Sequence, residues 1–291
     1  MKNFNFLDEM IKDFKAKDII NIIGKVGNGK TSLAVNIVRN IVINSNKNIA
    51  IFSLETTSVS LLSLITEMKN KGLNVFINKT DFEKDKEIDE ETSKGFFYIY
   101  DGESAKIGKI KSQIDNLIEE LKKRKQKLDL VCIDYLQLTY PSIDNLYIDT
   151  EDKKGKKLRE DYDVLIKKFA NTNLNEIMKT NIKKLKEIAE NYNIPIILVT
   201  MLSNNDEKRD EQRKVIKENS DVVVEIKRQE KDSIMKLTLP DKQTQNINVQ
   251  FNKTLCEFVE TNIAEELKEE KFKKELEQII KEHKDEFDKL S

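Results

Sequence analysis

The sequence predicts an α/β fold in which a mostly parallel sheet is covered by helices on both faces. Short apolar segments alternate with longer segments whose apolar residues recur at helical spacing, and the first apolar segment leads directly into a glycine-rich motif. Strands that alternate with helices form parallel sheets. Such sheets bind their ligands beyond the carboxyl ends of the strands, so we expect a functional site at that edge.

Strands are expected where runs of Ile, Val, Leu or Phe are bounded by polar residues or glycine. The expected buried strands are 19–24, 49–54, 96–100, 128–134, 194–200 and 221–226. Pro195 stands near the start of its strand, where it removes no ladder hydrogen bond. Antiparallel strands at the sheet edge are expected at 235–239, 248–251 and 255–259.

Helices are expected where apolar residues recur every three or four positions. One expected helix directly follows the glycine-rich motif, and the others span 58–68, 106–125 and 174–192. Residues 70–94 carry many charges with little pattern, so we expect short surface helices and loops there. Residues 141–173 are expected to be an insertion or mobile loop, and residues 261–291 a charged C-terminal helix.

The composition narrows the class of protein before any motif is considered. The 291 residues are 38% hydrophobic and 35% charged, which suits a packed core under a heavily charged surface. The net charge of −1 gives no overall basic field, so any contact with nucleic acid must use a local basic patch. Two cysteines, one histidine and no segment long enough to span a bilayer favour a cytoplasmic protein without disulfides, membrane anchorage or histidine-based metal chemistry.

Residues 24–31 match the phosphate-binding pattern G-x-x-x-x-G-K-T, between an expected strand and an expected helix. Glycines let backbone N–H groups approach a polyphosphate, and the helix N-terminus adds the positive end of its dipole. Lys30 is expected to reach the β- and γ-phosphates, and Thr31 to place its hydroxyl on Mg²⁺. The residues expected to bind the nucleotide here are Gly24, Val26, Gly27, Asn28, Gly29, Lys30, Thr31 and Ser32.

Two acidic residues at the ends of apolar segments are candidates to complete a hydrolytic site. Bound Mg²⁺ needs a carboxylate nearby, and an attacking water needs a group that orients or deprotonates it. Asp134 ends one segment and suits the Mg²⁺ role, and Glu55 follows another and suits the role on the water. On the residues alone, each acid could equally cap the element that follows it.

Three strings resemble, in order and spacing, the C-terminal ATPase domain of bacterial DnaB-type replicative helicases. They are Gly24 to Thr31, Ile51-Phe52-Ser53-Leu54-Glu55, and Ile133-Asp134-Tyr135-Leu136-Gln137-Leu138. The resemblance covers about residues 4–260 and begins almost at Met1. A separate N-terminal domain, through which such helicases engage primase, is therefore not expected in this chain.

The resemblance implies a RecA-like domain over residues 1–260 with a P-loop that binds and hydrolyses ATP with Mg²⁺. It implies that Glu55 is the general base that polarises water and Asp134 the Walker B acid, with Lys30 as the phosphate-loop lysine. It also implies a homo-oligomeric ring of the hexameric type that acts on single-stranded DNA in replication.

Two positions depart from the pattern of the family that this sequence resembles. The family's third motif carries a glutamine that senses the γ-phosphate, where this sequence has Met201, whose thioether cannot donate a hydrogen bond. The family's arginine finger, two residues after a lysine, corresponds to Thr244 after Lys242. An arginine finger contributes about 10³–10⁵ in rate. Turnover is therefore expected to be slow unless Lys242 or Arg228 compensates at the nucleotide.

Two charged segments, 141–173 and 204–219, are the candidate loops for contact with single-stranded DNA. Their Lys and Arg side chains would bind the phosphate backbone without sequence preference. Both segments also carry acids, so ordinary solvated loops remain an alternative. Two functions stay open: an ATP-driven motor that moves along single-stranded DNA, and a slow or non-translocating ATPase whose nucleotide state controls oligomerisation or partner binding.

Overall fold

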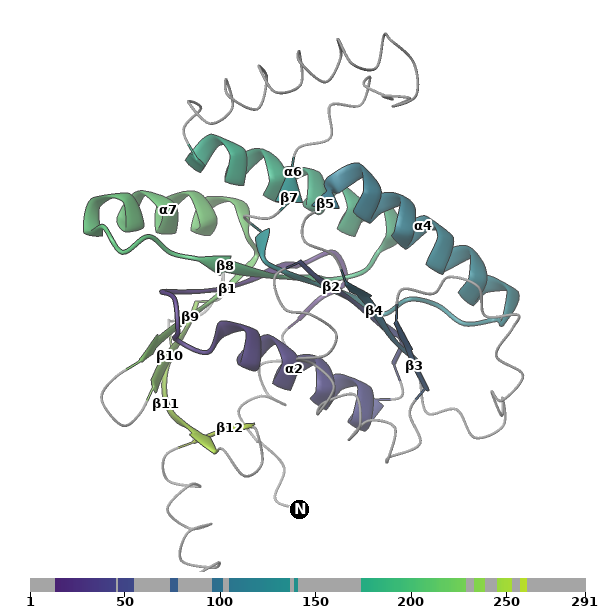
Figure 1. The fold of residues 1–291 in the computed structure, drawn as a ribbon, viewed down its shortest axis with the longest axis horizontal. Helices are drawn as coiled ribbons and strands as arrows, with labels where there is room; N and C mark the ends of the chain where they lie inside the picture. Colours follow the sequence, from purple (N-terminus) through teal and green to yellow (C-terminus); the bar gives the residue numbers. More distant parts are fainter. Residues whose placement is uncertain are drawn as a thin grey trace, which may run out of the picture.

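One large sheet with helices on both faces organises the chain (Figure 1). The computed structural model describes residues 14–45, 47–54, 74–77, 96–101, 105–136, 139–140, 174–228, 233–238, 245–252 and 257–260. Within these ranges the strand order is β12 (Glu257–Glu260), β11 (Gln245–Asn252), β10 (Ser233–Thr238), β9 (Val222–Arg228), β1 (Ile19–Gly24), β8 (Ile196–Met201), β6 (Leu130–Asp134), β2 (Ile49–Ser53), β4 (Phe96–Asp101) and β3 (Asn74–Ile77).

The strands from β9 to β3 are parallel to their neighbours, whereas β10, β11 and β12 add antiparallel pairs beyond β9. Strands β1, β2 and β6 are buried along their whole length, which explains why their sequences are continuous apolar runs rather than alternating ones. A separate two-stranded sheet joins β5 (Ala105–Lys106) to β7 (Thr139–Tyr140). Because the central strands are parallel, their carboxyl ends meet at one edge.

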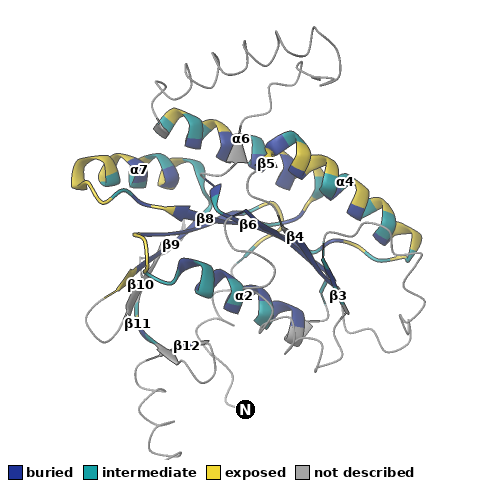
Figure 2. Ribbon diagram, in the orientation of Figure 1, coloured by how far each residue is buried: buried dark blue, intermediate teal, exposed yellow. Residues whose placement is uncertain are grey.

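The helices are divided between the two faces of the large sheet. Helix α2 (Lys30–Ser45) lies against one face, and α4 (Ile107–Lys123), α6 (Leu174–Tyr192) and α7 (Asp206–Asn219) cover the other (Figure 1). These last three helices bury the side that faces the sheet and expose the outer side (Figure 2). Among the described helices, none combines the length and the apolar character needed to cross a membrane.

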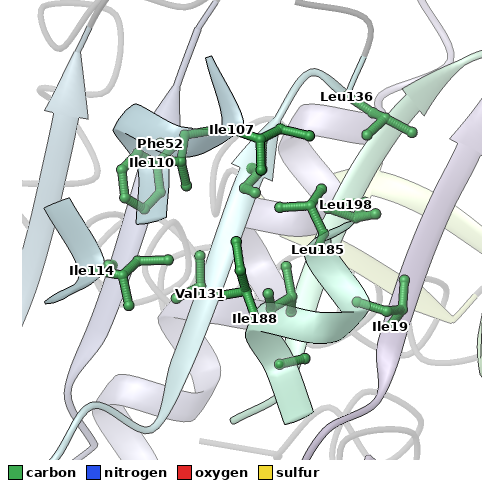
Figure 3. Packing of buried hydrophobic residues seen from close by; sticks show 14 of the residues in the cluster. Ile19, Phe52, Ile107, Ile110, Ile114, Val131, Leu136, Leu185, Ile188 and Leu198 are labelled. Atoms are coloured by element: carbon green, nitrogen blue, oxygen red, sulfur yellow. The ribbon is translucent and has the colours of Figure 1, made fainter. Parts of the chain in front are cut away.

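An apolar layer holds α4 and α6 against the sheet (Figure 3). Ile110 and Ile114 of α4 and Leu185 of α6 pack in it with Val131 of β6 and Leu198 of β8. All five side chains are buried, and those on α4 recur at the spacing of one helical face. The helix pattern in the sequence therefore corresponds to a real contact with the sheet.

Most of the expected elements are confirmed, including the antiparallel edge strands and the helices at 106–125 and 174–192. Short surface helices and loops were expected over residues 70–94. This expectation is wrong for residues 74–77, because they form the edge strand β3 beside β4. Phe76 of β3 is buried and stacks on Tyr98 at 5.3 Å between ring centroids. A strand of four residues among charged neighbours is too short to show an alternating pattern.

The expectation that residues 204–219 form a loop is also wrong, because residues 206–219 form α7. The side-chain oxygen of Asn205 accepts the N–H of Lys208 at 3.0 Å and caps the helix. Only Gln212 and Ile216 are buried on α7, too few to give an apolar stripe in the sequence. The expected elements at 58–68, 141–173 and 261–291 lie outside the described residues.

Leu185→Ala is expected to lower the free energy of unfolding by about 2–5 kcal/mol, because it leaves a cavity in the layer beneath α6. Urea unfolding followed by circular dichroism measures this change. Lys183→Ala, an exposed position on the same helix, is the matched control and should change stability by less than about 0.5 kcal/mol. Equal losses from the two substitutions would contradict the packing described for α6.

Candidate functional site

The glycine-rich loop between β1 and α2 has a backbone that requires its glycines. Gly27 and Gly29 have φ angles of +77° and +86°, in the left-handed region that other residues adopt at a cost. A Cβ atom on Gly24 would lie 2.6 Å from the backbone oxygen of Ile226 on the neighbouring strand β9. The loop can therefore take this path only with glycine at these positions.

Both strands beside β1 hold the loop in place. The side-chain amide of Asn28 donates to the backbone oxygen of Ile226 in β9 at 2.9 Å. On the other side, the N–H of Leu202 donates to the oxygen of Gly24 at 2.9 Å. The loop is thus attached at its start and at its middle before α2 begins.

Lys30, the first residue of α2, carries a buried charge next to the loop. Its side chain is folded back so that Nζ donates to the oxygen of Lys25 at 2.8 Å, and the residue is only 2% exposed. Its Nζ also lies 5.5 Å from the ring centroid of Tyr135, a distance suited to a cation–π contact. Tyr135 had no place in the sequence-based site; its position directly after the strand-end acid Asp134 is the signal that could have identified it.

Thr31 and Asp134 meet across the carboxyl edge of the sheet. The Thr31 hydroxyl donates to Oδ1 of Asp134 at 3.3 Å, and Asp134 is 4% exposed at the end of β6. A hydroxyl and a carboxylate are hard oxygen ligands of the kind that Mg²⁺ prefers. The pair of Thr31 and Asp134 therefore fits a magnesium ion bound with a phosphate group.

The Cys132 thiol lies in the same strand as Asp134. Burial is the main cause that raises the pKa of this thiol, and the nearby Asp134 carboxylate raises it further. The thiol is therefore neutral inside the strand.

The end of β2 lies next to Asp134. Ser53 is the register partner of Asp134, and the N–H of Leu54 donates to the backbone oxygen of Asp134 at 2.6 Å. Glu55 follows Leu54 in the sequence but lies outside the described residues, as do Lys242 and Thr244. Their predicted roles stay predictions.

The ends of β8 and β9 bring two further predicted positions to this edge. Met201 is the register partner of Gly24 and is 40% exposed at the end of β8. Arg228 ends β9 and is exposed. Val26 and Ser32 belong to the loop and to the first turn of α2, and Val26 is exposed. The predicted nucleotide-binding residues of the loop and of the start of α2 follow one another in the sequence, apart from Lys25. Arg228 lies two residues beyond Ile226, whose backbone oxygen accepts the Asn28 amide.

Helix α7 balances the positive charge that suggested contact with DNA. Residues 206–219 contain five acidic and five basic residues. Arg209 pairs with Asp206, and Arg213 pairs with Asp210 and with Glu225, which is buried on β9. Burial alone lowers the pKa of Arg213, but its hydrogen bond and ion pair with Glu225 raise the pKa above the ordinary value. These guanidinium groups stabilise the helix and neutralise a buried acid.

The cap of α7 is the sequence signal that could have corrected the loop assignment. Asn205 is followed by Asp206 and Glu207 in the first turn, and Lys217 stands in the last turn. This order of an N-cap, early acids and a late base is typical of a helix. The segment contains no glycine or proline to interrupt it.

A family model and several known proteins are similar to this chain in sequence. A family model described as "DnaB-like helicase C terminal domain" matches residues 1–259. The "Probable replicative DNA helicase" of Trieres chinensis is 30% identical over 213 residues, which cover 71% of this chain and 40% of the relative. The "Replicative DNA helicase DnaB" of Geobacillus stearothermophilus is 27% identical over 215 residues, which cover 72% of this chain and 41% of the relative. The chain thus spans less than half the length of these curated relatives.

Solved structures give the same fold. A structure described as an "ATPase Domain" matches with a TM-score of 0.59 and 18% identity, covering 88% of this chain and 89% of that chain. "The Structure Of A DnaB-Like Replicative Helicase And Its Interactions With Primase" matches with a TM-score of 0.59 and 18% identity, covering 89% of this chain and 62% of that chain. At this identity the likeness concerns the fold, and it confirms the expected RecA-like α/β architecture.

Asp134→Asn is expected to weaken Mg²⁺-dependent nucleotide binding by about 10–100-fold, the usual effect of removing a group that supports a metal ligand. The amide keeps the size of the side chain but loses the charge near Thr31. Titration with a fluorescent ATP analogue in Mg²⁺ and again in EDTA separates an effect on metal-dependent binding from an effect on binding of the nucleotide itself. The variant and the parent should differ in Mg²⁺ and coincide in EDTA, whereas an equal difference in both would place Asp134 outside the metal site.

Proposed function

This chain belongs to the family of DnaB-like helicase C-terminal domains, and on that premise we propose that it binds ATP with Mg²⁺ and hydrolyses it, acting on single-stranded DNA in replication. The observation that carries the proposal is the contact between Thr31 and Asp134 next to the buried Lys30. A glycine turn that binds no ligand would not need a buried lysine, two left-handed glycines and a strand-end acid in one place.

The loop and the start of α2 are proposed to hold the triphosphate. Backbone N–H groups of the loop and the N-terminus of α2 favour an anion, because the helix dipole is positive there. Lys30 would exchange the Lys25 carbonyl for the β- and γ-phosphates, so its present hydrogen bond keeps the charge satisfied until nucleotide binds. This arrangement supports nucleotide contact by Gly24 and by residues 26–32.

Hydrolysis is proposed to depend on Thr31, Asp134 and Glu55. Bound Mg²⁺ would supply the Lewis acid that neutralises charge on the phosphates. Thr31 would ligate the metal, and Asp134 would orient that hydroxyl and the water around it. Glu55 would orient the attacking water and accept its proton. The hydrogen bond from Leu54 to Asp134, one residue before Glu55, supports this role.

The charge that an arginine finger would provide is proposed to come from Arg228 or Lys242. Arg228 is exposed at the end of β9, two residues after the carbonyl that receives the Asn28 amide. This short separation supports contact between Arg228 and the nucleotide. The role of Lys242 rests on the sequence resemblance. If neither residue supplies this charge, turnover should be slow.

A cytoplasmic homo-oligomeric ring, hexameric like the DnaB-type helicases that the sequence resembles, is proposed as the working form. Contact with single-stranded DNA is proposed through the segment 141–173, whose basic residues suit a phosphate backbone. Helix α7 is not proposed as a DNA contact, because its arginines are paired within the chain.

A second function is favoured by Met201. Its position beside Gly24 at the end of β8 is close to the phosphate loop, yet its thioether cannot donate a hydrogen bond to a γ-phosphate. A domain that binds ATP without this signal could use nucleotide to control oligomerisation or partner binding instead of movement. The two functions predict different responses to DNA.

Lys30→Ala is expected to abolish nucleotide binding, because the positive charge beside the loop is removed. Equilibrium binding of a fluorescent ATP analogue in Mg²⁺ measures the effect. Lys25→Ala is the matched control: Lys25 is an exposed lysine of the same loop, and its backbone oxygen, which alanine keeps, accepts from Lys30. Equal binding by the two variants would remove the basis for a phosphate loop.

Single-stranded DNA is expected to accelerate ATP hydrolysis by the chain, and the acceleration should fall as salt rises because the contacts are with phosphates. Steady-state phosphate release with and without DNA, over a range of salt, measures this response. Tight ATP binding together with a rate that DNA leaves unchanged would reject the motor and favour the second function.

A further inference from the structure

We infer that Phe258, on the outermost strand β12, is a positioning residue that holds the phosphate loop in its nucleotide-binding shape. The inference rests on the proposed function, because it concerns the loop that would bind the triphosphate. It adds a residue that lies far along the sequence to a site whose loop, Thr31 and Asp134 come from β1, α2 and β6.

The contact lies at Gly29, the last loop residue before Lys30. A Cβ atom built on Gly29 would lie 2.8 Å from Cζ of Phe258, and all three of its nearest neighbours are atoms of that ring. Phe258 is 2% exposed, so the ring packs against the loop from the protein side. The glycine therefore serves two purposes here: it allows a φ of +86° and leaves room for the ring.

A buried hydrogen bond anchors this contact to α2, the helix that follows the loop. The backbone N–H of Phe258 donates to Oδ1 of Asn36 at 2.9 Å, across 222 residues of sequence. Asn36 lies on α2 and is 5% exposed. Phe258 also belongs to the apolar cluster that contains Leu33 and Ile37 of α2. Strand β12 is thus attached to α2 by this hydrogen bond and by the apolar cluster that Phe258 shares with the helix.

These contacts limit the ways in which the loop can move. The oxygen of Gly29 accepts the N–H of Leu33 at 2.9 Å in the first turn of α2, so Gly29 is attached to the helix on one side and packed on the ring on another. A loop held in its bound shape loses less conformational entropy when a ligand binds. Removal of the ring should therefore weaken nucleotide affinity even when the domain stays folded.

The test compares Phe258→Leu with Phe97→Leu in the full chain. Both phenylalanines are buried in the same apolar cluster, but Phe97 lies on β4, away from the loop. Phe258→Leu should raise the dissociation constant of a fluorescent ATP analogue, and the KM for ATP, about five- to tenfold, the size expected when binding must order a loop that was previously held. The kcat should change by less than about twofold, because the catalytic groups remain.

Phe97→Leu should leave nucleotide affinity within about twofold of the parent at a comparable loss of stability. Unfolding in urea gives the stability of each variant, so affinity can be compared between variants of equal stability. Equal loss of affinity in both variants, or unchanged affinity in Phe258→Leu, would overturn the inference.

A further variant tests the anchor and does not alter the ring. Asn36→Leu removes the oxygen that accepts the Phe258 N–H but keeps a side chain of similar size. Affinity for the ATP analogue should fall in this variant, and affinity equal to that of the parent would contradict the role of the anchor. If the parent chain binds no ATP analogue at all, the proposed function and this inference both fail. If the parent binds and the Phe258 and Asn36 variants bind equally well, only the inference fails.

Discussion

The hydrogen bond between Thr31 and Asp134 joins two residues that are 103 positions apart in the sequence. It exists because β1 and β6 both run parallel to β8, which lies between them, so their carboxyl ends reach the same edge. The buried apolar runs hold this register, since a shift of one residue would turn a strand-end side chain to the opposite face. The packing of helices on both faces therefore also positions the chemistry.

The sequence predicted those parts of the site that depend on local order. A strand, a glycine loop and a helix follow one another between residues 19 and 45, and the loop takes the left-handed conformation that its glycines allow. Asp134 could be placed at the same edge because parallel strands end together, a rule that needs no knowledge of side-chain contacts. The hydrogen bond to Thr31 then follows from the fold.

The remaining features depend on contacts or signals that a one-dimensional pattern does not show. The packing of Phe258 on Gly29 joins residues that are far apart in the sequence, and no spacing rule connects them. Helix α7 is stabilised by its cap and by ion pairs such as that between Arg213 and Glu225, so it lacks the apolar stripe by which helices are found. The same kind of ion pair gives both arginines of α7, Arg209 and Arg213, partners within the chain, so these two side chains are not needed to explain a contact with DNA.

The most direct test is a crystal structure of this chain with Mg²⁺ and a non-hydrolysable ATP analogue. We expect a metal ion about 2.0–2.1 Å from Oγ1 of Thr31, with Asp134 beside it and Nζ of Lys30 moved from the Lys25 carbonyl to the β- and γ-phosphates. A metal bound elsewhere, or a lysine still on that carbonyl with nucleotide present, would contradict the assignment of this edge of the sheet as the ATP site.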